Sequence, residues 1–185
     1  MNNDSEILEG QLREYYGRVV YSHKTHEKCA DILLNNLKLI KRWQIILSAI
    51  ASTGFIGAML GSGNTGAIGG LVVSTALLVL NAYTKDYNQG ELAQKHREAA
   101  ADLWVIREKY LSLLTDLKTS AKAEEMVRAE RDSLLQELHG IYSGAPSTNY
   151  RAYRVAQEAL QSLEDMTFSD DEVDAFLPKE LKRRN

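Results

Sequence analysis

The chain has 185 residues, with 22 Lys and Arg against 25 Asp and Glu, which gives a formal net charge of −3 at pH 7. This balance gives no general electrostatic reason to bind nucleic acid, the single Cys excludes an intrachain disulfide, and the apolar content of 44% excludes a disordered chain. Residues 43–84 contain no Asp, Glu, Lys or Arg, so the charges crowd into the remainder of the chain. Such a distribution is untypical of a soluble globular enzyme.

Residues 1–42 are predicted to form an N-terminal amphipathic helix in the cytoplasm. Mainly apolar or small residues recur there at alternating spacings of four and three, which is the heptad pattern of a packed helix. This first seam consists of Leu8, Leu12, Tyr15, Val19, Ser22, His26, Cys29, Leu33, Asn36 and Ile40. His23, His26 and Cys29 suggest metal ligands, but no second cluster completes a four-ligand site, so we interpret them as helix-packing residues and expect no metal.

Residues 43–84 are predicted to form a hairpin of two membrane-spanning helices, 43–60 and 67–83. Each is roughly 26 Å long at about 1.5 Å per residue, the short end of what crosses the hydrocarbon core of a bilayer. The linking sequence GSGNTG is too short for anything but an antiparallel return. The alternative is a soluble bundle with this hairpin as its core, which we disfavour because a soluble core helix of this length normally carries a charged polar stripe.

Basic residues flank the hairpin at its open end only. Lys38, Lys41 and Arg42 precede the first predicted membrane helix and Lys85 follows the second, whereas the linking loop has no charge. Because basic residues mark the cytoplasmic side of membrane helices, both termini are expected in the cytoplasm. The chain is therefore predicted to be a two-pass membrane protein.

The loop of the hairpin contains Gly61, Gly63 and Gly66 in the spacing of a dinucleotide-binding fingerprint. That fingerprint requires a strand before it and an acidic residue on a second strand, whereas here it follows a predicted helix. We interpret these glycines as a turn. Because no catalytic triad, phosphate loop or paired carboxylates have a recognisable context elsewhere, neither an enzyme nor a cofactor is expected.

Two patterns inside the hairpin carry the functional hypotheses. Polar residues line one side of the first helix, the polar row, and recur on the second helix: Gln44, Ser48 and Ser52, then Ser74, Thr75 and Asn81. Small residues, which let helix backbones approach closely, are Ala49, Thr53, Gly57, Gly61, Gly66 and Gly70. The polar residues either bond to neighbouring helices or line a water-filled lumen, and a lumen requires several copies of the chain.

Residues 85–145 are predicted to form cytoplasmic coiled helices. A second seam with the same heptad spacing consists of Leu92, His96, Ala99, Leu103, Ile106, Tyr110, Leu113 and Leu117. We expect the two seams to pack against each other, and we assign an oligomer seam to Leu33, Leu103, Ile106, Tyr110 and Leu113. A further helix over about 120–139 is predicted to end at Gly140, Gly144 and Pro146.

Residues 146–185 are predicted to form a helical C-terminal extension with a basic tail. The apolar period indicates a helix over 148–166, and Ser169 with Glu172 is a capping box that begins a last short helix. The tail contains Lys179, Lys182, Arg183 and Arg184. We expect the tail to be solvated, with contact to anionic lipid or to a nucleic-acid-bearing partner as the less favoured alternative.

The arrangement resembles the SLATT family of bacterial two-transmembrane effectors of conflict and antiphage systems. The resemblance covers residues 8–138 and rests on the lead helix REYYGRVVYSHKTHEKCADILLNNLKLIKRW, the short membrane hairpin, and the helix TKDYNQGELAQKHREAAADLWVIREKYLSLLTDL. It implies a toxic effector of the inner membrane that a separate protein triggers, either a reverse transcriptase with its RNA or DNA or a nucleotide-second-messenger synthase. The short stand-alone chain is most similar to the reverse-transcriptase-associated branch.

The sequence thus predicts an all-α chain with membrane lipid and further copies of itself as partners. In the main hypothesis it forms a pore or disrupts the membrane, which leads to cell death and abortive infection. The alternative is a non-conducting coiled-coil anchor that recruits a partner protein.

Overall fold

The computed structural model describes residues 3–59, 64–162 and 168–178, and these residues are almost entirely helical, without a strand. The helices are α1 (Asn3–Met59), α2 (Asn64–Asp86), α3 (Gln89–Lys118), α4 (Glu124–Gly144), α5 (Tyr150–Gln161) and α6 (Asp170–Phe176). The predicted all-α fold is confirmed.

Helix α1 is continuous from the first seam into the hairpin. Its 57 residues correspond to a rod of about 85 Å. Between Gly17 and Gly54 the sequence contains neither Gly nor Pro, so nothing in the backbone interrupts the hydrogen-bond ladder where the charged segment gives way to the apolar one. Our predicted boundary at Trp43 is therefore a change of composition and not a break in the helix.

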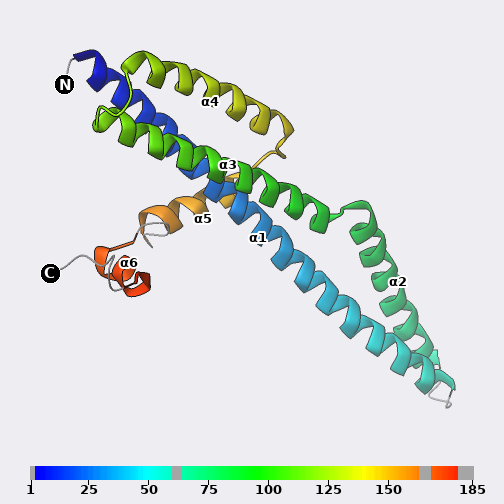
Figure 1. Cartoon of the computed structure of the whole chain (residues 1–185). Coiled ribbons are helices and arrows are strands. Elements are labelled where there is room, and N and C mark those ends of the chain that lie inside the picture. Colours follow the sequence, from blue (N-terminus) through cyan, green and yellow to red (C-terminus); the bar gives the residue numbers. More distant parts are fainter. Residues whose placement is uncertain (1–2, 60–63, 163–167, 179–185) are drawn as a thin grey trace.

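The chain returns along α1 in two consecutive helices. Figure 1 shows α2 beside the C-terminal half of α1 and, after a bend, α3 beside its N-terminal half. Asn88 stabilises the bend, because its side chain accepts a hydrogen bond of 3.1 Å from the backbone N–H of Glu91 and so caps α3. The antiparallel return that the short loop predicted is present in the structure.

The hydrophobic core lies between α1, α3 and α4. It combines residues of both seams with three residues of α4: Leu8, Leu12, Val19, Leu103, Ile106, Tyr110, Leu113, Leu117, Val127, Leu134 and Leu138. Each fully buried side chain of this size contributes about 1.5–3 kcal/mol. The predicted packing of the two seams against each other is thus observed, within one chain.

The C-terminal elements differ in length from their predictions. Helix α4 begins at Glu124 and passes through Gly140 before it ends at Gly144. Helix α5 is shorter than the predicted 148–166, ending at Gln161, and residues 163–167 lie outside the described part of the chain. The predicted capping box is confirmed, because Ser169 Oγ accepts from Glu172 N at 3.3 Å while Glu172 Oε2 accepts from Ser169 N at 2.8 Å.

Candidate functional site

The end of α1 and the whole of α2 form a two-helix hairpin that projects away from the core (Figure 1). Gln44 Nε2 donates hydrogen bonds to Asn81 Oδ1 at 2.8 Å and to Thr84 Oγ1 at 3.3 Å, which joins the two helices near their open end. Deeper in the hairpin, half-buried Leu47 and Ala51 of α1 lie on the same side of the helix as Gln44. The first predicted membrane helix therefore has one face turned toward α2, which we call the inward face. This face continues the heptad spacing of the first seam.

Most of the remaining surface of the hairpin is apolar and exposed. The exposed large side chains include Ile45, Ile46, Ile50, Phe55 and Ile56 of α1 and Ile68, Leu71, Val72, Leu78 and Val79 of α2. Only one helical stretch among the described residues, within Gly66–Lys118, is long and apolar enough to cross a membrane by the combined criteria of length and hydropathy. Its 18-residue window has a mean hydropathy of 1.7 and none of it is buried. This surface is suited to lipid and not to water.

The polar residues of the hairpin divide into two groups. Gln44 and Asn81 are hydrogen-bonded to each other between the two helices, with Asn81 exposed, so contact between neighbouring helices accounts for both residues. Ser48 and Ser52 stay exposed, and their hydroxyls donate to the carbonyl oxygens of Gln44 at 2.7 Å and Ser48 at 2.9 Å, one turn earlier in α1. Ser74 is exposed on α2. Because serines bonded to their own helix are tolerated in lipid, the lumen-lining role stays a prediction.

The close approach between the two helices uses a glycine that the sequence reading missed. A Cβ atom on Gly54 would lie 3.6 Å from Cα of Gly70 and 3.8 Å from the carbonyl oxygen of Gly66. Gly54 follows Leu47 by one heptad, so extending the first seam past Ile40 would have found it. Gly66 and Gly70 are half-buried.

The remaining small residues of the prediction do not contribute to this contact, or cannot be placed in it. Ala49 and Thr53 are exposed, so they are not part of the inward face of α1. Gly57 belongs to α1, but its surroundings are outside what the structure describes, and Gly61 and Gly63 lie outside the described residues, as does the basic tail.

The residues assigned to an oligomer seam are placed mainly inside a single chain. Leu103, Ile106, Tyr110 and Leu113 are at most 2% exposed, and Leu33 is half-buried. One copy of the chain already covers them, so no second copy is needed to remove them from water. Their role between subunits stays a prediction.

Polar side chains are buried where the two seams pass each other, above the hairpin. His26 and His96 are each 3% exposed, and their Nδ1 atoms lie 2.9 Å apart, so one imidazole donates its proton to the other. His23 Nδ1 donates to the carbonyl oxygen of Ala100 at 2.9 Å. Both paired histidines were predicted as seam residues, but their pairing was not.

Cys29 lies in the same region and is 1% exposed. Asn149 Nδ2 approaches its Sγ at 3.8 Å, and burial raises the pKa of the thiol, which disfavours the reactive thiolate. Among the residues that the structure describes, no group of three or more His, Cys, Asp or Glu could hold a metal ion.

We expect the histidine pair to make the fold sensitive to acid. Burial, then the nearby His96 and His23, lower the pKa of His26 to about 4, and burial also lowers the pKa of His96. Between pH 6.5 and about 4 the unfolded chain binds more protons at His26 than the folded chain, so the free energy of unfolding falls as the pH falls, by up to about 1.4 kcal/mol per pH unit for this histidine, and His96 acts in the same direction. Above pH 6.5 their contribution is constant.

Thermal unfolding of the full chain, followed by circular dichroism in lipid nanodiscs at several pH values from 7.5 to 4.5, measures this dependence. His26→Gln keeps a hydrogen-bonding side chain but removes the titration, so its melting temperature should fall less steeply with pH than that of the wild type. His139→Gln, on the exposed surface of α4, serves as the control and should match the wild-type slope. Equal slopes for wild type and His26→Gln would contradict the prediction.

Comparison with known proteins identifies the family. A profile described as "SMODS and SLOG-associating 2TM effector domain family 4" matches residues 8–172, from the first turns of α1 to the first turn of α6. No curated protein and no solved structure matches the chain. The match spans the paired seams, the exposed apolar hairpin and most of the C-terminal extension. The chain therefore belongs to the SLATT family, whose two-transmembrane effector domains are associated with conflict and defence systems.

Proposed function

We propose that this protein is an antiphage effector of the bacterial inner membrane that assembles from several copies and permeabilises the membrane when a partner triggers it. The observation that carries this proposal is the hairpin surface, which is apolar on most sides and yet carries exposed Ser48 and Ser52 along α1. An anchor requires only the apolar surface. The serines give an assembly of hairpins a side that can face water.

The membrane part of one chain, two helices, is too small to form a pore, so the proposal requires assembly of several chains. Two helices enclose no lumen, so conduction requires several hairpins with a common polar side. Ala49 and Thr53 are exposed on α1 and small, which suits them to close packing against a neighbouring hairpin. The contact between α1 and α2 of the same chain, at Gly54, Gly66 and Gly70, would not be affected by this packing.

The long α1 provides a mechanical connection between trigger and membrane. It contributes Leu8 to the core at one end and Gly54 to the hairpin contact at the other, without a break in the helix. A partner that rotates or tilts the cytoplasmic part of α1 would therefore move its membrane part as well. With both termini in the cytoplasm, as the basic flanks predict, a cytoplasmic partner has access to this part.

The partner is proposed to be a separate protein that responds to infection. The family description names association with SMODS and SLOG domains. This supports a nucleotide-second-messenger synthase more directly than a reverse transcriptase with its RNA or DNA, the other partner that the sequence resemblance implies.

Loss of membrane potential tests the proposal. Induced wild-type protein, expressed with the genes that flank it and challenged with phage, should depolarise bacteria within one growth cycle, as a potential-sensitive dye reports. Vesicles that contain the purified protein should likewise release potassium once the activated partner is added, with a steep dependence on the ratio of protein to lipid. A chain that inserts and captures its partner but leaves both the potential and the vesicles intact would establish the anchor alternative instead.

A further inference from the structure

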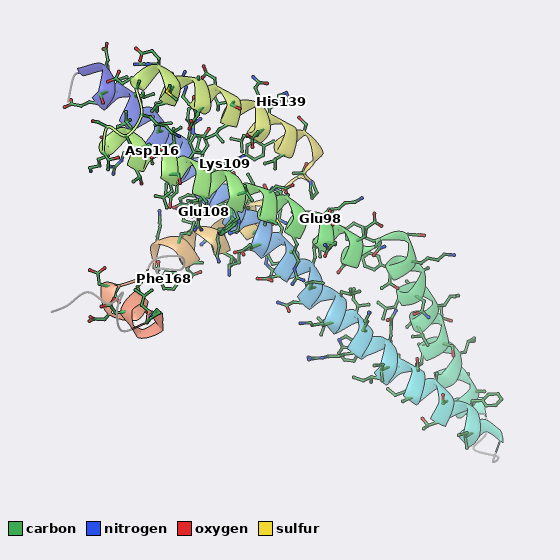
Figure 2. All side chains as sticks on the ribbon, in the orientation of Figure 1. Glu98, Glu108, Lys109, Asp116, His139 and Phe168 are labelled. Carbon is green, nitrogen blue, oxygen red and sulfur yellow. The ribbon has the colours of Figure 1, made fainter. Side chains whose placement is uncertain are left out.

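A cleft of about 850 Å³ lies between α1 and α3 on the cytoplasmic side of the hairpin. One wall is a face of α1 from His23 to Asp31, and the other is a face of α3 from Arg97 to Arg107. Between Arg97 and Arg107, the α3 face is lined by the small side chains of Ala100 and Ala101. Phe168, just before α6, completes the lining. Figure 2 shows Phe168 and His139 of α4 on opposite sides of the α1–α3 pair. Trp104 lines this cleft and also a second hollow between α3 and α4.

The lining of the cleft carries an excess of positive charge, although the whole chain is acidic. Its charged side chains are Lys24, Lys28, Arg97 and Arg107 against Glu27 and Asp31. Lys24 Nζ lies 2.8 Å from Glu27 Oε2, so the carboxylate of Glu27 is paired with a cation of the lining. Arg107 forms an ion pair of 2.6 Å with Glu108, a residue that does not line the cleft. The cleft is therefore suited to an anion, and Arg97 in particular can present two parallel N–H groups to a phosphate.

Two aromatic rings accompany these cations. Trp104 is 47% exposed and Phe168 is 70% exposed, values that leave ring faces accessible to a ligand. His23 also lines the cleft: its Nδ1 donates to the carbonyl oxygen of Ala100, and its Nε2 lies 3.7 Å from Oε1 of Glu27. Cations beside exposed aromatic rings are the combination that holds a phosphate and a stacked base together.

The position of the cleft argues for a soluble ligand and not for a lipid headgroup. The nearest lining residue of α1, Asp31, precedes Trp43 by a stretch of helix about 18 Å long, and His23 lies about 12 Å farther from the membrane. A headgroup at the level of Trp43 does not reach the cations of the cleft. A free nucleotide in solution reaches these cations.

We propose that the α1–α3 cleft binds a nucleotide, with its phosphates on Arg97 and Lys28 and its base against Trp104. A ligand there contacts both the long α1 and the helix that packs along it. Binding itself does not depend on the proposed permeabilisation of the membrane, so the two can be tested separately.

The test uses the full chain in phosphatidylcholine nanodiscs, with Trp43→Phe so that Trp104 is the only Trp. Energy transfer from Trp104 to the methylanthraniloyl derivative of ATP should saturate, and ATP or cyclic di-AMP should compete. Adenosine has the base but no phosphate, and pyrophosphate has phosphates but no base, so each should compete at least about tenfold more weakly than ATP. Calorimetry with ATP then compares variants, because it does not require Trp104.

Arg97→Gln and Trp104→Leu are each expected to weaken ATP binding by about tenfold or more, without loss of helix content because both side chains are exposed. Lys95→Gln is the matched control: it removes an exposed cation of α3 that pairs with Glu91 outside the cleft, and affinity should stay within about twofold. The proposal would be overturned if energy transfer did not saturate, or if Arg97→Gln bound ATP with wild-type affinity. It would also be overturned if Lys95→Gln lost as much affinity for ATP as Arg97→Gln. So would nanodiscs with phosphatidylglycerol that abolish binding, because the cleft would then hold lipid.

Discussion

Leu103→Asp is expected to unfold the part of the chain in which α1, α3 and α4 pack together. Leu103 is 0% exposed and lies in the core where α3 packs on α1. An aspartate there is either a buried unpaired charge or a carboxyl group with a raised pKa, and the loss of packing adds to the cost of several kcal/mol. Because a domain is stable by only about 5–15 kcal/mol, the variant should melt far below the wild type or be degraded in cells.

Leu111→Asp is the matched control for this prediction. It introduces the same aspartate into the same helix, but Leu111 is 43% exposed, so the carboxylate remains in water. Helical circular dichroism during heating and protein abundance by immunoblot measure both variants. If Leu103→Asp melts and accumulates like the wild type, or if Leu111→Asp is lost to the same degree, the packing of the two seams does not stabilise the chain.

The packing of the seams was predictable because it depends on local spacing and a short connection. A heptad repeat specifies which side of a helix is buried, and the hairpin loop requires the second helix to return antiparallel. Leu12 and Ile106 are buried for this reason. The spacing does not specify whether the covering helix belongs to the same chain, and the sequence therefore led to an oligomer seam at residues that a single chain already buries.

Other features depend on relations that no local pattern contains. The hydropathy changes sharply at Trp43, but a helix continues across a change of solvent as long as the backbone remains regular, so the composition boundary did not mark an end of α1. His26 and His96 are separated by 70 residues and meet only because of the antiparallel register. The cations of the cleft likewise look like ordinary solvated faces until Lys28 and Arg97 share one cleft.

Inside the membrane, the sharpest expected difference is between two lysine substitutions on α1. Ser52 and Ile50 are both exposed on the isolated hairpin, and they lie about 160° apart around the helix. A lysine near the middle of a membrane helix costs about 2.5–3.5 kcal/mol when it faces lipid. A single hairpin or a simple anchor therefore predicts the same loss of insertion for Ser52→Lys and Ile50→Lys.

An assembly with the polar row toward a water-filled lumen predicts different outcomes for the two variants. Ser52→Lys should still accumulate in the membrane, because its ammonium group would be hydrated, and it should change ion selectivity or abolish depolarisation through the ring of added charge. Ile50→Lys should be depleted from the membrane fraction. Membrane fractionation and a potential-sensitive dye read both effects, with Ser52→Ala as the control that removes the hydroxyl without adding charge. Equal depletion of the two lysine variants would mean that Ser52 faces lipid or a neighbouring helix in the assembled protein, and the lumen hypothesis would then be wrong.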